Sequence, residues 1–371
     1  MTVTDLDSGY MQRALKLAWR GLYTTDPNPR VGAVLVNDGR VVGEGWHARA
    51  GEPHAERHAL AQAGTLARGA TCYVTLEPCS HTGRTGPCAD ALIDAGVRRV
   101  VAAMQDPNPQ VAGQGLARLR AAGITVECGL LEAEARALNP GFIKRMETGL
   151  PLVRVKLAMS LDGRTAMASG ESQWITGTPA RQAVQRLRAR SSAVITGIGT
   201  VLADNPALTV RPDDWSEGDY PGTVRQPLRV VLDRRLQIPL EARLLAESGE
   251  VWVISAASDA LAGAVRARGA QVRTLPGSGS GTDLMALLRL LAEHGCNEVL
   301  VEAGATLAGA FVREKLWDEL VVFMAPTLLG SSARPLLLLP EIATMAEQQR
   351  LTLQRVDTVG KDLCLTYIPQ L

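Results

Sequence analysis

The 371-residue sequence predicts an α/β protein with two domains. Short runs rich in Val, Ile and Leu alternate along the chain with segments whose apolar residues have helical spacing. This alternation is typical of sheets covered by helices. It pauses at Leu150-Pro151 and starts afresh at Leu152, and an average domain has about 150 residues. We therefore expect a first domain over residues 1–147 and a second over residues 148–371.

The elements of the first domain follow from local signals. Met11, Ala14 and Ala18 have helical spacing and predict a helix over 10–19. Asn37-Asp38-Gly39 lies between two β-rich runs and predicts a hairpin. Pro87 fits the first turn of a helix, where its missing N–H is not needed. The expected helices are 10–19, 54–63, 87–95 and 133–146, and the expected strands are 31–36, 41–45, 71–76 and 97–104.

The second domain repeats the alternation with longer apolar strands. Continuous apolar runs separated by helices are typical of parallel or mixed sheets that are buried on both faces. The expected strands are 153–159, 193–196, 228–232, 251–255 and 298–301, and the expected helices are 178–190, 261–268, 283–294 and 305–314.

Composition and charge exclude several classes of protein. Lys and Arg number 39 and Asp and Glu number 38, so the formal net charge is +1 and no overall field attracts a polyanion. Aromatic residues make up 4%, too few for a broad base-stacking surface. No segment approaches the roughly 18 consecutive apolar residues of a membrane span, and the acidic N-terminus lacks the features of a signal peptide. We expect a cytoplasmic protein without nucleic-acid or membrane partners.

The cysteines fall into two groups. Six cysteines in 371 residues are too few for a disulfide scaffold. Four of them lie among apolar or small residues and are expected to be buried packing residues, namely Cys72, Cys128, Cys296 and Cys364. Cys79 and Cys88 belong to a different pattern.

That pattern is a set of metal ligands. His54, Cys79 and Cys88 supply one imidazole and two thiolates, which suit Zn²⁺ and leave the fourth tetrahedral position for water. Glu56 is too close in sequence to His54 to share its direction as a ligand, and we expect it to act as a general acid and base. One Zn²⁺ ion bound in this way matches the zinc-deaminase signature H-x-E with a later P-C.

Two details refine this interpretation. Eight residues separate Cys79 from Cys88, whereas the usual deaminase motif has two. The stretch H-A-E-R-H is not a metalloprotease motif, because that motif needs Glu directly after the first His, so His58 is expected to be a packing or surface residue. Two alternatives remain: a nucleic-acid base deaminase fused to an unrelated nucleotide-binding domain, and a structural zinc module on a nucleotide-sensing domain.

Residues 27–32 (PNPRVG), 47–56 and 77–88 resemble the pyrimidine deaminase of riboflavin biosynthesis. This resemblance implies a cytidine-deaminase-like three-layer fold. It also implies that Asn28, His47 and His81 line the substrate pocket, and that Arg84 meets a phosphate.

From Val153 the sequence resembles the reductase partner of the same bifunctional family, which has a dihydrofolate-reductase-like fold. The most specific stretches are 155–166, 169–176, 196–200 followed by 204–206, and 301–307. Gly304 precedes a predicted helix, whose free N–H groups suit a pyrophosphate. No G-x-G-x-x-G fingerprint is present.

This second resemblance implies NADPH as cofactor and a set of site residues. The implied NADPH contacts are Ala158, Trp174, Thr200, Asp204, Gly304, Ala305, Thr306 and Leu307. The implied contacts to the ribosyl phosphate substrate are Ser172, Arg188, Leu208, Arg211 and Glu302. Arg188 and Arg211 suit phosphate because a guanidinium binds it in bidentate fashion. Lys156 and Asp204 are expected to position the sugar and the cofactor and to assist proton delivery. Ser192 and Arg234 depart from the family pattern.

Together the resemblances imply a bifunctional enzyme of riboflavin biosynthesis. The first domain would hydrolytically deaminate 2,5-diamino-6-ribosylamino-4(3H)-pyrimidinone 5′-phosphate. The second would use NADPH to reduce the ribosyl group to ribityl, giving 5-amino-6-ribitylamino-uracil 5′-phosphate. A homodimer or higher homo-oligomer is expected on the same basis.

Overall fold

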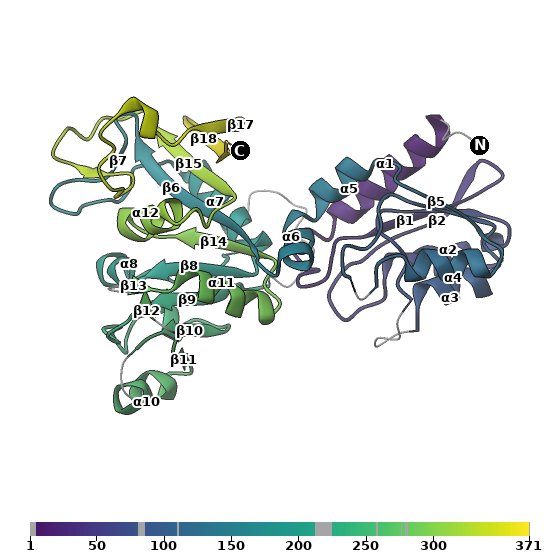
Figure 1. The fold of residues 1–371 in the computed structure, drawn as a ribbon, viewed down its shortest axis with the longest axis horizontal. Helices are drawn as coiled ribbons and strands as arrows, with labels where there is room; N and C mark the ends of the chain where they lie inside the picture. Colours follow the sequence, from purple (N-terminus) through teal and green to yellow (C-terminus); the bar gives the residue numbers. More distant parts are fainter. Residues whose placement is uncertain are drawn as a thin grey trace. The chain divides into compact units, whose positions relative to one another are not determined.

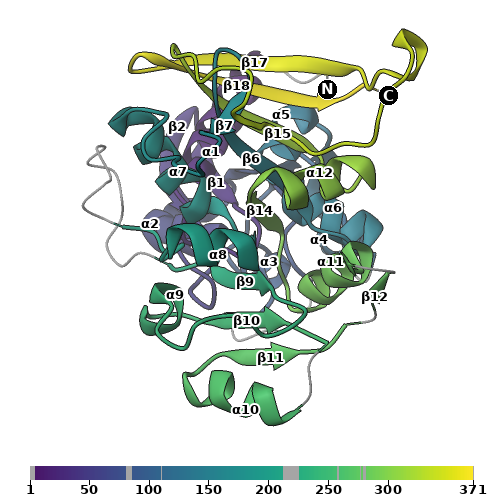
Figure 2. The ribbon, with the colours of Figure 1, turned by 90° about the vertical axis from the view of Figure 1, so that its left-hand side faces the viewer.

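The computed structural model describes residues 5–80, 86–109, 111–211, 225–256, 259–275, 277–278 and 281–370. The chain forms two compact units, Met1–Leu150 and Pro151–Leu371, which we call the first and the second unit. Among the described residues, no helix is both long and apolar enough to cross a membrane. Each unit has its own sheet, and Figures 1 and 2 label the elements of both.

A mixed sheet forms the middle of the first unit. Its strands are β1 (Gly32–Asn37), β2 (Arg40–Trp46), β3 (Thr71–Val74), β4 (Arg99–Ala102) and β5 (Thr125–Cys128). They lie in the order β2-β1-β3-β4-β5. β1 is antiparallel to β2 and β3, whereas β3, β4 and β5 run parallel. Parallel strands end at the same edge of a sheet, so the segments that follow β3 and β4 start close together.

Helices cover both faces of this sheet. They are α1 (Asp5–Trp19), α2 (Ala55–Ala63), η1 (Gly64–Ala67), α3 (Cys88–Asp94), α4 (Gln114–Ala121), α5 (Glu132–Leu138) and α6 (Pro140–Thr148). Figure 1 shows α1 and α5 on one face and α2, α3 and α4 on the other. Met11 of α1 packs with Val34 in one core cluster, and Ala59 of α2 packs with Leu35 in another. Consecutive strand residues point to opposite faces, so the unit is the expected three-layer structure.

Two glycines let these layers approach closely. A Cβ at Gly32 would lie 2.0 Å from the carbonyl oxygen of Ala14 in α1. A Cβ at Gly43 would lie 2.1 Å from the carbonyl oxygen of Ala59 in α2. Neither position has room for a side chain, so the backbone of each helix lies directly on the sheet. This close packing fixes the position of α2, whose N-cap is His54.

A larger mixed sheet forms the second unit. Its strands are β6 (Leu152–Ser160), β8 (Ala193–Gly197), β9 (Leu228–Leu232), β10 (Val251–Ile254), β11 (Gln271–Arg273), β14 (Glu298–Glu302), β15 (Glu319–Ala325), β17 (Leu351–Val359) and β18 (Asp362–Pro369). Their order is β11-β10-β9-β8-β14-β6-β15-β18-β17, and Figure 2 shows them from β11 at the bottom to β17 at the top. The strands from β11 to β15 run parallel, and β15, β18 and β17 are antiparallel.

The remaining elements of the second unit surround this sheet. The helices are α7 (Thr178–Arg190), α8 (Ile198–Asp204), α9 (Arg243–Ala246), α10 (Asp259–Ala267), α11 (Leu284–Glu293), α12 (Ala305–Arg313) and η3 (Met345–Glu347). Two short ladders pair β7 (Arg164–Ala166) with β16 (Arg334–Pro335) and β12 (Gly277–Ser278) with β13 (Gly281–Thr282). Val184 of α7 packs with Phe323 of β15, and Val201 of α8 packs with Val231 of β9.

The structure corrects two expectations. The single helix expected over 133–146 is wrong: α5 ends at Leu138 and α6 begins at Pro140, because proline lacks the N–H that a continuous helix needs. Cys128 is exposed rather than buried, since it ends the edge strand β5. The other three cysteines of that group are buried, as expected.

Candidate functional site

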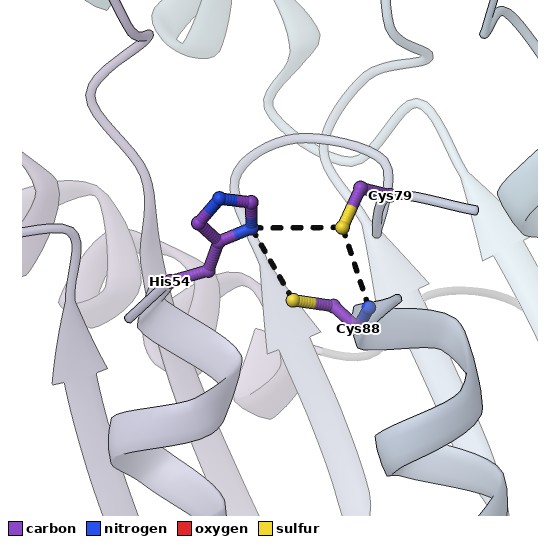
Figure 3. Close-up of side chains that lie close together, drawn as sticks. All are labelled: His54, Cys79 and Cys88. Atoms are coloured by element: carbon purple, nitrogen blue, oxygen red, sulfur yellow. Dashed lines mark hydrogen bonds between the residues drawn. The ribbon is translucent and has the colours of Figure 1, made fainter. Parts of the chain in front are cut away.

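Three potential metal ligands meet in the first unit. Each of His54, Cys79 and Cys88 offers one ligand atom, and these three atoms lie within 4.8 Å of one another. Figure 3 shows the three side chains pointing toward a common centre. His54 Nδ1 lies 3.6 Å from Cys79 Sγ and 3.4 Å from Cys88 Sγ. The donor set of one imidazole and two thiolates fits zinc.

Local structure places each of these ligands. His54 is the N-cap residue of α2, and Cys88 is the first residue of α3, after the N-cap Pro87. Cys79 follows β3, and its sulfur accepts a hydrogen bond of 3.3 Å from the backbone N–H of Cys88. The N-terminus of α3 thus directs an N–H group and its positive partial charge toward the Cys79 sulfur, and His54 lies at the N-terminus of α2.

The electrostatics favour a thiolate at Cys79. Hydrogen bonds from the Cys88 thiol, from His54 and from the Cys88 N–H lower the pKa of Cys79 well below its usual range, although burial acts in the opposite direction. The hydrogen bond to Cys79 raises the pKa of His54, and burial opposes it. A thiolate is the form that ligates a metal, so the site is already suited to a cation.

Glu56 lies in the first turn of α2, one residue after its start, and is 3% exposed. Burial raises the pKa of its carboxyl to about 7, against the effect of the nearby His54. A carboxyl removed from water beside a metal centre can hold a proton or release it near neutral pH.

Asn28 and His47 lie beside this centre. His47 Nδ1 lies 3.2 Å from the carbonyl oxygen of Pro53, which can only accept, so Nδ1 carries the proton. In the neutral ring, Nε2 then accepts a hydrogen bond of 3.1 Å from the Asn28 amide. Burial lowers the pKa of His47, which favours this neutral form. The rings of His47 and His54 are 5.3 Å apart, so the three residues form one group. His81 and Arg84 lie outside the described residues.

In the second unit the structure brings Lys156, Arg188 and Glu302 together. Glu302 ends β14 and is the register partner of Lys156 on β6. Arg188 Nε and Nη2 donate to the two carboxylate oxygens of Glu302 at 2.6 and 2.9 Å, and Nη1 donates to the Thr209 carbonyl at 3.0 Å. The Arg188 guanidinium, expected to meet a phosphate, is therefore already engaged by a carboxylate.

This cluster keeps its charges in a buried setting. Burial raises the pKa of Glu302, but Arg188, Lys156 and Arg211 outweigh burial and leave that pKa below its usual value. Burial lowers the pKa of Lys156, and Glu302 opposes it. Glu302 is thus a charged carboxylate, and the cationic side chains of Arg188, Lys156 and Arg211 are near enough to stabilise its charge.

The implied NADPH contacts lie near the ends of neighbouring strands. Gly304 is the N-cap of α12, and Ala305, Thr306 and Leu307 form its first turn. A Cβ at Gly197, which ends β8, would lie 3.6 Å from Leu307 Cδ2, so the starts of α8 and α12 are neighbours. Thr200 and Asp204 lie on α8, and Ala158 lies on β6. Free N–H groups of two helix starts suit a phosphate-bearing cofactor.

Other expected residues differ in exposure. The Trp174 side chain is 69% exposed, and the Arg181 guanidinium lies 4.6 Å from its ring centroid. Ser172 precedes it and is partly buried. Arg211 is exposed, and its backbone N–H donates to Gln185. Leu208 is 2% exposed and packs with the core, so its backbone is the part that can reach a ligand.

The structure also places the two residues that depart from the family pattern. The Ser192 hydroxyl accepts hydrogen bonds from the backbone N–H groups of Asn297 and Glu298, so it joins the ends of β8 and β14. The Arg234 side chain is exposed, and its carbonyl oxygen accepts from the Ser255 hydroxyl.

Sequence reasoning did not single out two charged residues whose side chains bind backbone groups beside the ligand segments. Arg57 Nη2 donates to the carbonyl oxygens of Gly86 and Pro87, directly before Cys88. Glu77 is 4% exposed and lies two residues before Cys79. The only signal in the sequence was that a charged residue lies close to each ligand segment. The backbone groups that these side chains bind lie 29–39 residues away along the chain, so the sequence did not show the contacts.

Both units match known protein families. Residues 4–104 match the cytidine and deoxycytidylate deaminase zinc-binding region, and residues 151–365 match the RibD C-terminal domain. The riboflavin biosynthesis protein RibD of Escherichia coli is 54% identical over 368 residues, covering 97% of this chain and 98% of the relative. That of Bacillus amyloliquefaciens is 41% identical over 367 residues, covering 98% and 97%.

Solved structures agree over nearly the whole chain. A structure of Acinetobacter baumannii RibD has a TM-score of 0.92 and 50% identity, and the match covers 99% of both chains. A Thermotoga maritima protein has a TM-score of 0.84 and 34% identity, covering 98% of this chain and 99% of that one. It is described as a diaminohydroxyphosphoribosylaminopyrimidine deaminase/5-amino-6-(5-phosphoribosylamino)uracil reductase.

These matches confirm the expected fold class and the expected pair of activities, with zinc and NADPH as cofactors. They support this interpretation and not a nucleic-acid base deaminase joined to an unrelated domain. The chain belongs to the RibD family of riboflavin biosynthesis enzymes, which combine a zinc-binding deaminase with a reductase.

Proposed function

We propose that the first unit deaminates diaminohydroxyphosphoribosylaminopyrimidine and that the second reduces 5-amino-6-(5-phosphoribosylamino)uracil. These are the two activities in the description of the Thermotoga maritima protein, with which this chain shares 34% identity over 98% of its length. The observation that carries the first activity is the grouping of His54, Cys79 and Cys88 beside the buried Glu56. In this proposal residues 1–147 form the deaminase and residues 148–371 the reductase, and the unit boundary after Leu150 supports that division.

His54, Cys79 and Cys88 hold the zinc ion in this proposal. Zinc, when bound, polarises a water molecule so that it gives up a proton near neutral pH. Glu56 would accept that proton on its carboxylate and pass it to the ring nitrogen beside the amino-bearing carbon, as the water oxygen bonds to that carbon. It would then carry the second proton of the water to the amino group, which leaves as ammonia when its C–N bond breaks, while the water oxygen becomes the carbonyl oxygen of the product. Its burial supports this role, because a carboxyl out of water holds and passes on a proton more readily near pH 7.

Asn28 and His47 orient the pyrimidine. His47 holds the Asn28 amide nitrogen through Nε2, so the Asn28 carbonyl oxygen is the group left to accept an N–H from the ring or its amino groups. His81 completes the pocket in this proposal. It lies outside the described residues.

The second unit binds NADPH and the ribosyl phosphate. NADPH, when bound, supplies a hydride to C1 of the opened sugar. The N–H groups at the start of α12, from Gly304 to Leu307, face the cofactor phosphates, with Thr200 and Asp204 of α8, Ala158 and the exposed Trp174 completing its contacts. Support comes from the proximity of the α8 and α12 starts.

Glu302 accepts hydrogen bonds from the sugar hydroxyls, and Arg188 aligns it through the paired hydrogen bonds. The exposed Arg211, with Ser172 and the backbone of Leu208, faces the substrate phosphate. Lys156 and Asp204 assist delivery of a proton to the reduced centre. Lys156 can do so because burial makes its ammonium a readier proton donor than one in water.

Glu56→Gln tests the deaminase assignment. The variant should retain one zinc per chain and lose ammonia release from the diaminopyrimidine, because Gln cannot transfer the proton. His54→Ala should lose the zinc itself. His58→Ala is the matched control: His58 is exposed on the same helix and should keep both zinc and activity. Deamination by Glu56→Gln at the normal rate would rule out the proposed proton transfer.

We further propose a cytoplasmic homodimer that binds no nucleic acid. The edge strand β17 supports self-association, because it exposes Leu351, Leu353 and Val356 to 38, 50 and 51%. An exposed apolar edge strand is a surface that another chain can cover. Sedimentation should give twice the 39.5 kDa chain mass. Leu353→Glu should give the monomer, and Leu66→Glu, at a residue 57% exposed in the first unit, should not.

A further inference from the structure

Within the described part of the chain, the buried carboxylate of Glu77 accepts hydrogen bonds from backbone N–H groups of one distant segment. Its Oε2 accepts from Asp106 at 3.0 Å and from Gly113 at 2.9 Å. Its Oε1 accepts from Gly115 at 2.8 Å and from Leu116 at 3.2 Å. Each oxygen has two donors, so the carboxylate satisfies four N–H groups at once.

Three of these four donors form the start of α4. Gly113 is the N-cap of that helix and has no side chain to cap it, so Glu77 supplies the cap from another part of the chain. A carboxylate at a helix N-terminus is also favoured by the helix dipole. The loop from Asp106 and the first turn of α4 are thus tied to the residue that lies two positions before Cys79.

The contact between α4 and the Cys79 segment extends to the backbone. A Cβ at Gly115 would lie 1.9 Å from the carbonyl oxygen of Pro78 and 3.2 Å from Glu77 Oε1. The first turn of α4 therefore lies directly on the Pro78 peptide. Because no side chain fits between them, α4 cannot move towards the Pro78 peptide without displacing Pro78, which directly precedes Cys79.

The same helix also reaches the segment of the second thiolate. Arg118 of α4 forms a 2.5 Å ion pair with Asp90 of α3, whose first residue is Cys88. Arg118 also donates to the carbonyl oxygen of Ser80. The Ala89 N–H donates to the carbonyl oxygen of Cys79. α4 thus contacts the segment around Cys79 and the helix that begins at Cys88.

We propose that Glu77 is a positioning residue of the metal centre, which fixes Cys79 for metal binding by holding the Pro78-Cys79 segment on the start of α4. The inference rests on the proposed ligand set of the deaminase. Cys79 lies on no helix or strand, so its sulfur is placed by the backbone around it. The four hydrogen bonds of Glu77, with the fit of Gly115, provide that restraint.

Substitution of Glu77 tests the proposal in the zinc-loaded full chain. In Glu77→Gln the amide NH₂ faces two N–H donors, so two hydrogen bonds are lost and repulsion replaces them. Zinc release into a chromogenic chelator should be about 10- to 100-fold faster, the effect typical of losing an outer partner of a metal ligand. Glu77→Asp keeps the negative charge, but its side chain is one methylene shorter and reaches the N–H groups less well. Its zinc release rate should therefore lie between the rates of the wild type and of Glu77→Gln.

Cobalt(II) provides a readout that does not depend on activity. In the wild type the two thiolates should give thiolate-to-cobalt charge-transfer bands. Glu77→Gln should weaken these bands, since Cys79 is no longer held, and Cys79→Ser should remove about half of their intensity. Where Glu77→Gln does not fold, the comparison between Glu77→Asp and the control decides.

Asp7→Asn is the matched control. Asp7 is a buried carboxylate of the same unit, 5% exposed, and its partners are Tyr73 and Arg99. Asp7→Asn should lower the melting temperature but leave zinc release and the cobalt bands unchanged. Equal zinc release rates in the Glu77 variants and Asp7→Asn would overturn the proposal.

A separate result would overturn the ligand set itself. If Cys79→Ser kept both the zinc affinity and the full cobalt bands, Cys79 would not be a ligand, and the inference about Glu77 would fall with it. If the wild type showed the thiolate-to-cobalt bands and Glu77→Gln showed them at the same intensity, the positioning role of Glu77 would be refuted, while Cys79 would remain a ligand.

Discussion

Removing Arg188 should destabilise the second unit strongly, because it leaves a buried carboxylate without its main partner. The side chains of Arg188 and Glu302 are 11 and 10% exposed, and two hydrogen bonds of 2.6 and 2.9 Å join them. Breaking one partner of a buried ion pair costs about 3–5 kcal/mol. Lys156 still faces Glu302 in Arg188→Ala, so we expect the lower end, about 3 kcal/mol.

For a unit of this size, 1 kcal/mol corresponds to about 2–4 °C, so the melting temperature should fall by about 6–12 °C. Differential scanning calorimetry of the full chain at pH 7 measures this. Arg186→Ala on the same helix α7, at a position that is only partly buried, is the matched control and should shift the transition by about 1–2 °C, as surface substitutions do.

The sign of the pH dependence provides a second check. The pKa of Glu302 is lowered in the folded wild type, so the stability it contributes is full above its unfolded value near 4.5 and is lost as the pH falls through the folded value. The difference between wild type and Arg188→Ala should therefore shrink on acidification below about pH 4.5. Equal melting temperatures for Arg188→Ala and Arg186→Ala at pH 7 would refute the reasoning.

Three further predictions concern other parts of the second unit. Hydrogen bonds from Ser160 and from the backbone at 329–330 lower the pKa of Asp162 to about 2. The protection of the 329–330 amides against hydrogen exchange, taken relative to the intrinsic exchange rate at each pH, should therefore stay constant down to about pH 4 and fall towards pH 2; a loss of protection already at pH 5–6 would contradict this. Trp174→Ala should weaken NADPH binding at least about fivefold in a fluorescence titration, since stacking on a base is worth about 1 kcal/mol or more, with little change in melting temperature; unchanged affinity would remove Trp174 from the cofactor site. Val356→Glu should give a monomer in sedimentation, and a persistent dimer would place the interface elsewhere.

Residue chemistry made the metal centre predictable from sequence. Histidine and cysteine beside prolines that start helices form a rare pattern, and the structure brings His54, Cys79 and Cys88 together as expected. Glu77 and Arg57 were not predicted, because their partners are backbone groups far along the chain, and backbone groups carry no sequence signal. Arg188 and Glu302 are 114 positions apart, and the family resemblance placed both at the substrate, but their direct pairing becomes visible only when α7 is placed beside the end of β14 in the folded unit.

The fold was predictable to a similar degree. Strands buried on both faces, such as β9, and helices with one apolar face, such as α7, were located by their apolar patterns. The strands of the larger sheet after residue 314 were not predicted, namely β15, β17 and β18, and β15 was missed although it is buried. In β17 the apolar positions Leu351, Leu353 and Val356 do not keep one alternation, because the register shifts between Leu353 and Arg355. Exposure at the sheet edge is a property of the assembled sheet, and local sequence does not encode it.

The central claim is that one chain carries two separate chemistries, of which only the first depends on zinc. The most direct test supplies zinc-loaded and zinc-stripped full-length protein with NADPH and either the diaminopyrimidine substrate or its deaminated product, and follows ammonia release and NADPH absorbance separately. Zinc removal should abolish ammonia release and, with the diaminopyrimidine, NADPH oxidation as well. Oxidation with the deaminated compound should be unchanged. Ammonia release that continued without zinc, or loss of NADPH oxidation with the deaminated compound, would contradict the account.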